Sequence, residues 1–211
     1  MKREDWLFVP IALFGALEVA ANVSAARFIS FLGFSGPGGV WTLALSYICL
    51  DLILQIKGVA YARKVRWGVL GAALVAALYF QLVIIMPHPA FYTGAAAFAG
   101  VAGTTLRITL ASICAFAVAT TVDIWLFNWL NTRVEPYVRV VASGLVTLCL
   151  DTVVFILVAF LGTGIPLWPT MEGQYVLKLM ALVIAGPGIY LARTVYGVPI
   201  SLKDIRASKG L

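Results

Sequence analysis

Charged side chains are scarce in this chain of 211 residues: aspartate, glutamate, lysine and arginine together make up only 11% of it. Hydrophobic residues account for 62%, and the mean hydropathy is +1.00. A soluble domain of this length cannot hide so much apolar surface from water. The composition therefore excludes an ordinary soluble protein and indicates that the chain resides in lipid.

Metal-ligating and nucleophilic side chains are also few. The chain has one histidine, His88, and three cysteines, each of which lies singly in an apolar stretch. No HExxH, GxSxG or phosphate-cradling glycine loop accompanies them. The sequence therefore predicts no metal site, no disulfide, no cofactor and no enzymatic activity. An integral-membrane enzyme that acts on a lipid-soluble substrate stays open as an alternative.

Six apolar stretches are long enough to cross a bilayer, which takes roughly 18 to 20 residues of helix. They cover residues 6–31, 40–57, 67–86, 104–130, 138–162 and 173–196. The remaining loops and tails are too short for a separate soluble domain. We therefore expect residues 1–211 to form a single all-α transmembrane domain of six helices. Residues 91–102 are predicted either as an outer half-helix or lid, or as an extension of the fourth helix.

Lysine and arginine alternate between loops, which predicts the orientation. Segments 32–39, 87–103 and 163–172 contain neither residue. The basic residues in the other loops and the tails are Lys2, Arg3, Lys57, Arg63, Lys64, Arg66, Arg133, Arg139, Arg193, Lys203, Arg206 and Lys209. The positive-inside rule places them, and both termini, on the cytoplasmic side. The net charge of +6 thus suits an anionic membrane surface rather than nucleic acid, and short loops favour a bacterial inner membrane.

Three aspartates, Asp51, Asp123 and Asp151, lie inside these predicted spans. An ionised carboxylate in hydrocarbon is strongly unfavourable, so such residues usually face a protein-lined cavity and mark the path of a ligand or ion. The sequence therefore predicts a transporter.

Four of the predicted helices carry a stripe of polar residues at helical spacing. The stripes are Glu18 and Asn22; Asp51 and Gln55; Ser112, Thr120 and Asp123; and Thr147 and Asp151. Because residues at these spacings share one face of a helix, we expect the stripes to face one shared pocket. Hydrogen bonds that only fasten helices together are the alternative, above all for the hydroxyl residues.

Aromatic residues accompany the two later aspartates. Phe127 follows Asp123 by four residues, Phe155 follows Asp151 by four, and Trp125 lies between the first pair. The two helices also resemble each other, and repeat-built transporters place their sites where the repeats meet. An aromatic side chain beside each acid suits a flat heteroaromatic ligand.

Basic residues inside the spans have two possible roles. Arg27, Arg107 and Lys178 are predicted either to reach outward to the headgroups or to neutralise a buried carboxylate. About 24 Å of helix separates Arg107 from Asp123, too far for a contact. We therefore assign Arg107, Arg27 and Glu18 to gating or structural roles.

One motif is more specific than these patterns. Arg107-Ile108-x-x-Ala111-Ser112 leads to Asp123-x-x-x-Phe127, and Ser143 leads to Asp151-Thr152-x-x-Phe155. Here the chain resembles the queuosine-precursor transporters of the vitamin-uptake-transporter type, six-helix proteins related in fold to the substrate-binding subunits of ECF vitamin importers. The resemblance implies import of 7-deazaguanine precursors, with the two aspartates gripping exocyclic amino and ring N–H donors.

The chain also departs from that family. The family has glutamine shortly before each aspartate, where this chain has Thr120 and Leu148, and glutamate where it has Gln55. A related purine or another small heteroaromatic vitamin therefore stays open as the ligand.

A stripe of small residues along the first helix suggests possible partners. Its members are Ala12, Ala16, Ala20 and Ser24. Such a stripe allows close approach of helices, which suits packing within the chain, docking to an energy-coupling subunit or formation of a homodimer.

Overall fold

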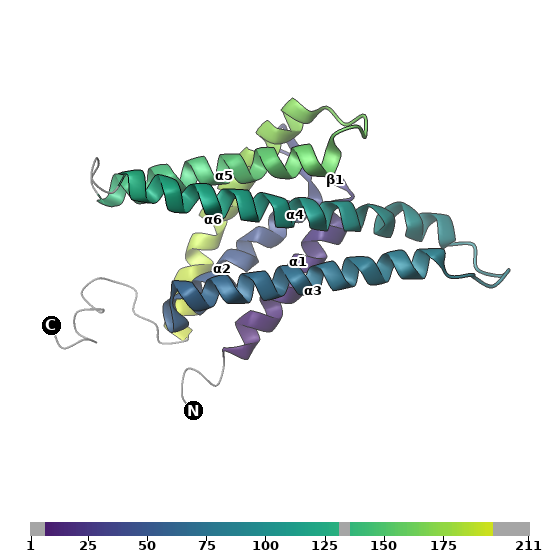
Figure 1. Ribbon diagram of the computed structural model, residues 1–211, viewed down its shortest axis with the longest axis horizontal. Helices are drawn as coiled ribbons and strands as arrows, with labels where there is room; N and C mark the ends of the chain where they lie inside the picture. The colour runs from purple at the N-terminus through teal and green to yellow at the C-terminus, as the bar shows by residue number, and fades with distance from the viewer. Residues whose placement is uncertain (1–6, 131–135, 196–211) are drawn as a thin grey trace.

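A computed structural model describes residues 7–130 and 136–195 of the chain, and most of these are helical (Figure 1). The helices are α1 (Phe8–Ser24), α2 (Thr42–Lys57), α3 (Val59–Ile85), α4 (Ala95–Leu130), α5 (Pro136–Phe160) and α6 (Leu167–Val195). Five helical segments are long and apolar enough to cross a membrane, one of them being α2 together with the 3-10 turn before it (Gly38–Lys57, 20 residues). α1, with 17 residues, falls short of that length. The prediction of a mostly helical membrane protein is therefore confirmed, with helices of spanning length for five of the six predicted spans.

A small β-hairpin separates α1 from α2 and corrects the first predicted span. Strand β1 (Phe28–Phe31) pairs antiparallel with β2 (Phe34–Pro37), and a 3-10 turn, η2 (Gly38–Trp41), follows. The predictions that helix continues to residue 31 and that the fold is entirely α were wrong here. Apolar length alone suggested helix, but phenylalanine and isoleucine also favour strands. The run Gly36-Pro37-Gly38-Gly39 then opposes regular helix.

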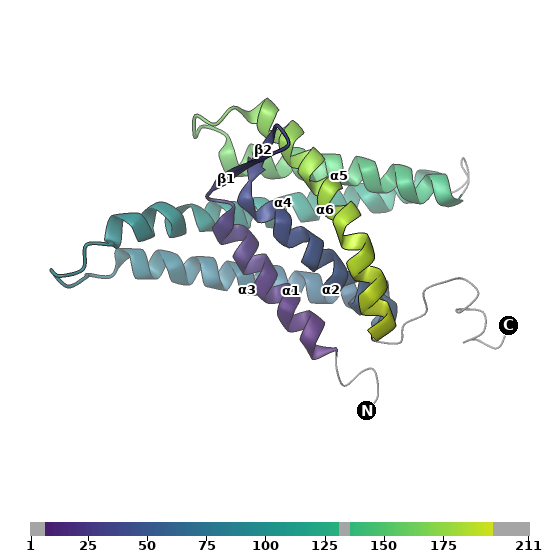
Figure 2. The same cartoon turned by 180° about the vertical axis from the view of Figure 1, so that it is seen from behind.

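The helices form two groups that cross each other. Figures 1 and 2 show α3, α4 and α5 running nearly parallel, whereas α1, α2 and α6 cross them obliquely. In the first group α4 packs against both α3 and α5, and in the second α2 packs against both α1 and α6. The two groups also touch each other, through contacts of α1 with α3 and α4 and of α5 with α6.

Two connections differ in detail from the sequence prediction. α3 begins directly after Gly58, whose φ of 83° makes the turn from α2, so Arg63, Lys64 and Arg66 belong to the first turns of a helix. α4 begins at Ala95, so residues 95–102 extend the fourth helix, which was one of the two alternatives predicted for residues 91–102, whereas residues 91–94 precede the helix.

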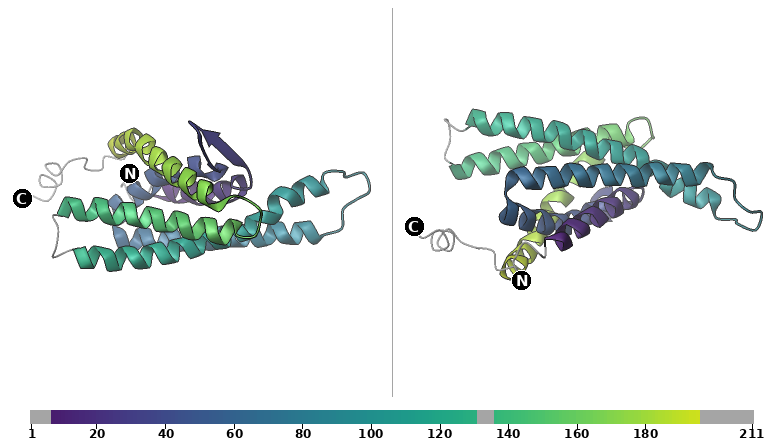
Figure 3. Two further views of the ribbon diagram at one scale, coloured as in Figure 1. Left: turned by 90° about the horizontal axis from the view of Figure 1, so that it is seen from above. Right: turned by 60° about the horizontal axis from the view of Figure 1, so that its bottom comes forward.

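The connections between the helices lie at two opposite ends of the bundle. Figure 3 (left) shows the start of α5, the end of α6 and the turn between α2 and α3 toward one end of the bundle. The connections from α3 to α4 and from α5 to α6 lie toward the opposite end. That the first end is cytoplasmic stays a prediction from the basic residues.

Two glycines hold the hairpin region between α1 and α6. A Cβ atom on Gly39 of η2 would collide with the backbone of Ala21 in α1. A Cβ atom on Gly173 of α6 would collide with the carbonyl oxygen of Ser35 in β2. Since backbone rather than a flexible side chain fills the space in both places, only glycine permits this close approach.

We predict that Gly173→Ala destabilises the protein by about 1–3 kcal/mol or more, because the added methyl group would push α6 away from the hairpin. The measurement is the melting temperature of the purified protein in detergent. Gly15→Ala in α1 is the matched control, since nothing lies within 4 Å of the Cβ it would add. Equal melting temperatures for Gly173→Ala and the wild type would contradict the close contact.

Candidate functional site

A cavity of about 390 Å³ lies between the two helix groups. All six helices contribute to its wall, together with Pro37 of β2 and Gly39 and Val40 of η2. Its volume falls within the range of small-molecule sites in proteins. The described wall includes three carboxylates, Glu18, Asp123 and Asp151, and two cations.

Eight of the residues predicted from the sequence line this cavity. They are Glu18, Asn22, Ser112, Thr120, Asp123, Thr147, Asp151 and Phe155. They come from α1, α4 and α5, so the structure brings together three of the four predicted polar stripes.

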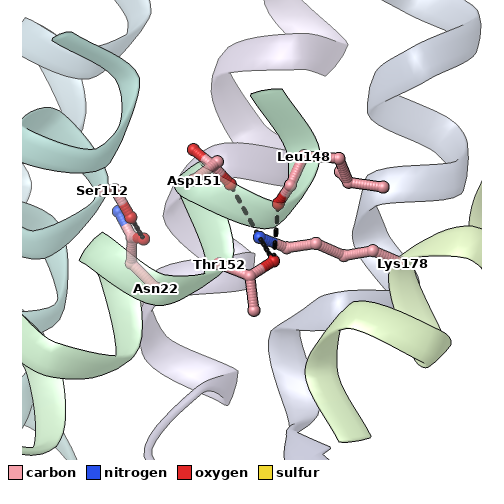
Figure 4. Close-up of polar contacts among 6 residues, drawn as sticks. All are labelled: Asn22, Ser112, Leu148, Asp151, Thr152 and Lys178. Atoms are coloured by element: carbon pink, nitrogen blue, oxygen red, sulfur yellow. Dashed lines mark hydrogen bonds and ion pairs between the residues drawn. The ribbon is translucent and has the colours of Figure 1, made fainter. Parts of the chain in front are cut away.

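Asp151 is held by an ion pair across the cavity wall. Lys178 Nζ of α6 lies 2.7 Å from Asp151 Oδ2 and also donates to Thr152 Oγ1 at 3.2 Å (Figure 4). Thr152 in turn donates to the carbonyl oxygen of Leu148 at 2.8 Å. Lys178 is only 5% exposed, so its charge is stabilised by this carboxylate and not by solvent. In Figure 4 the other carboxylate oxygen of Asp151 points away from the lysine.

Asp123 has a different partner. Thr147 Oγ1 of α5 donates to Asp123 Oδ1 of α4 over 3.1 Å. The two helices are therefore joined by a hydrogen bond between side chains that both line the cavity.

A second contact between side chains joins α1 to α4. Ser112 Oγ donates to Asn22 Oδ1 at 3.1 Å, as Figure 4 also shows. Asn22 is 3% exposed, and its side-chain nitrogen Nδ2 has no hydrogen-bond partner in the described structure. The Nδ2 group of Asn22 is therefore a hydrogen-bond donor without an acceptor at the cavity wall.

Arginine and aromatic side chains form another part of the wall. The guanidinium of Arg66 lies 4.6 Å from the centroid of the Phe116 ring and 5.8 Å from that of Phe14. Lys178 Nζ lies 5.9 Å from the centroid of the Phe155 ring. Both cations therefore lie within cation–π distance of an aromatic ring that lines the cavity.

Three of the other predicted residues, Asp51, Gln55 and Trp125, do not line the cavity. Asp51 and Gln55 of α2 are absent from its wall, and Gln55 is exposed. Trp125 is 63% exposed and stacks on Trp129, with 6.3 Å between the ring centroids. Phe127 belongs to α4, but its side chain lies outside the described residues.

The two arginines assigned to gating or structure also lie away from the cavity. Arg107 donates hydrogen bonds to the carbonyl oxygens of Val158 and Leu161, at the C-terminal end of α5. Cations are favourable there because the last carbonyls of a helix lack partners within it. Arg27, in the turn between α1 and β1, is exposed.

Among the polar and aromatic residues of the wall, sequence reasoning missed Tyr47, Arg66, Phe116 and Gln174. For Lys178, the structure shows the second of the two predicted alternatives, the neutralised carboxylate. Gln174 lies four residues before Lys178, the spacing that identified the other stripes, so the same criterion could have found it. The spacing gives no such signal for Arg66, which was grouped with the basic residues of a loop.

Comparison with known proteins gives concordant matches. The family model described as "Putative vitamin uptake transporter" matches residues 37–192. The "Probable queuosine precursor transporter" of Bacillus subtilis (strain 168) is 24% identical over 186 residues, which cover 85% of this chain and 81% of that protein. The "Queuosine precursor transporter" of Escherichia coli (strain K12) is 26% identical over 151 residues, or 71% of this chain and 67% of that protein. No solved structure matches the chain.

These matches bear on activity and location. The family is one of transporters, which points to a role other than catalysis. The apolar helices make the chain a multi-pass integral membrane protein, and its bacterial relatives support a bacterial inner membrane. The chain belongs to the queuosine-precursor transporter family, of the vitamin-uptake-transporter type.

Proposed function

We propose that the protein imports a small heteroaromatic compound, a 7-deazaguanine precursor of queuosine or a related purine, and binds it in the cavity between the helix groups. The observation that carries this proposal is the cavity itself, whose wall combines three carboxylates with aromatic rings. The names of the two bacterial relatives supply the ligand class. The protein acts as an autonomous carrier formed by one transmembrane domain.

Asp123 and Asp151 accept hydrogen bonds from N–H groups of the ligand. Each has one carboxylate oxygen engaged by the protein, with Thr147 and Lys178 respectively, and keeps a second oxygen. An ionised carboxylate only accepts hydrogen bonds, so the pair selects ligands rich in N–H donors over carbonyl-rich analogues. Charge-assisted bonds are also stronger than neutral ones, which offsets the desolvation of both partners.

Aromatic rings provide the faces against which the ligand packs. Phe155 and Phe116 line the cavity from α5 and α4, and a cation lies near each ring. A flat heteroaromatic ligand buries its faces against such rings while its edge reaches polar groups.

Transport follows from movement of one helix group against the other. The cavity lies between the groups, so a relative tilt would open it toward one side of the membrane and close it toward the other. Pro187 lies inside α6 and lacks the N–H that a helix requires, so α6 can flex at this residue.

We predict that Asp123→Asn and Asp151→Asn each weaken binding of 7-deazaguanine by at least about tenfold, because a charge-assisted acceptor is lost. A thermal-shift titration of purified protein measures this change. Asp51→Asn is the matched control, since Asp51 is absent from the cavity wall. Equal ligand-induced stabilisation of the wild type and both variants would refute the assigned site.

We predict that Lys178→Met lowers the melting temperature more than the double variant Lys178→Met with Asp151→Leu. The single change leaves the half-buried carboxylate of Asp151 without its counter-charge, whereas the double change removes both charges. Thermal unfolding without ligand measures both variants. A single variant as stable as the double one would mean that the pair contributes nothing to folding.

A second candidate function, the substrate-binding subunit of an ECF-type importer, is favoured by one observation. The small residues Ala12, Ala16, Ala20 and Ser24 of α1 are all exposed. They are therefore accessible to a coupling subunit or to a second copy of the chain. If the stripe served packing within the chain, these residues would be covered by another helix. Uptake in cells that lack every energy-coupling subunit separates the candidates, because only an autonomous carrier retains it.

A further inference from the structure

Glu18, grouped with structural charges from the sequence, has an unusual environment in the fold. It is 8% exposed and lines the cavity. Across residues 7–130 and 136–195, no hydrogen bond or ion pair engages its carboxylate, whereas Asp123 and Asp151 each have a partner. Arg66, in the same wall, attracts this carboxylate without forming an ion pair or a hydrogen bond with it. The carboxylate therefore still needs hydrogen-bond donors that the described residues do not supply.

Asn22 stands one turn further along the same helix and presents the complementary group. Its Oδ1 is engaged by Ser112, and its Nδ2, buried and lining the same cavity, has no acceptor. Residues at i,i+4 lie about 6 Å apart along a helix and share one face. One side of α1 therefore offers the cavity a carboxylate acceptor next to an amide donor.

This pair matches one particular arrangement of ligand groups. Two neighbouring N–H donors satisfy a carboxylate through two parallel hydrogen bonds, and a carbonyl oxygen beside them accepts from the amide. A 2-amino-substituted lactam, the edge that guanine carries, presents these three groups in a row.

We propose that Glu18 and Asn22 of α1 form the subsite that recognises the 2-amino-lactam edge of the ligand. Glu18 accepts from the ring N–H and the exocyclic amino group, and Asn22 Nδ2 donates to the carbonyl oxygen. This inference rests on the proposed function and deepens it, since Asp123 and Asp151 are then left to receive the ligand's remaining N–H groups.

Two probes that differ by one group test the proposal. 7-Deazaguanine carries the complete edge, whereas 7-deazahypoxanthine lacks only the exocyclic amino group. Wild-type protein is expected to bind 7-deazaguanine at least about tenfold more tightly, because the hypoxanthine analogue leaves half of the carboxylate unsatisfied. Dissociation constants of purified protein from calorimetric titration measure the ratio.

Glu18→Gln is expected to reduce this preference to less than about threefold, by weakening 7-deazaguanine much more than 7-deazahypoxanthine. Asn22→Leu is expected to weaken both probes alike, because both carry the carbonyl group. Glu172→Gln is the matched control, since Glu172 is exposed on α6 and absent from the cavity wall.

Equal dissociation constants of the two probes for the wild type would contradict the proposed subsite. This comparison needs no variant, so it can be made even if Glu18→Gln does not fold. A preference that Glu18→Gln leaves intact would also overturn it. In both cases tight binding of 7-deazaguanine would leave the proposed function standing. Failure of the wild type to bind either probe would instead remove the proposed function and this inference together.

Discussion

The cavity depends on the ion pair between Lys178 of α6 and Asp151 of α5, which joins the two crossing helix groups at 2.7 Å. A lysine that is 5% exposed cannot remain charged among apolar helices without such a partner. The pair therefore fixes how closely α5 approaches α6. It also distinguishes the acids of the wall, because Asp151 forms an ion pair with Lys178, whereas Glu18 has only the longer-range attraction of Arg66.

Helix geometry made much of the site predictable from the sequence. Residues one turn apart share a face whatever the tertiary fold, so Thr147 and Asp151, like Glu18 and Asn22, could be paired in advance. The cost of a carboxylate in hydrocarbon then required those faces to point inward. The structure agrees for α1, α4 and α5, whose stripes meet at the cavity.

The spacing of residues does not reveal how a helix is rotated and tilted in the bundle. The predictions for α2 and for Lys178 depended on this rotation and tilt. In α2, Tyr47 reaches the cavity but Asp51, one turn later, does not, because α2 crosses the first group obliquely and its face leaves the cavity. For Lys178, an outward reach to the headgroups and an inward ion pair were equally compatible with the sequence. The hairpin was missed because a short apolar run suits a strand as well as a helix.

The position of that hairpin constrains how the protein can be made. Strands β1 and β2 are synthesised early, yet β2 packs against α6, the last helix of the described chain. Until α6 has been synthesised, β2 lacks the helix that packs against it, and Ser35 lacks its close contact with Gly173. Completion of the native arrangement must therefore wait for α6.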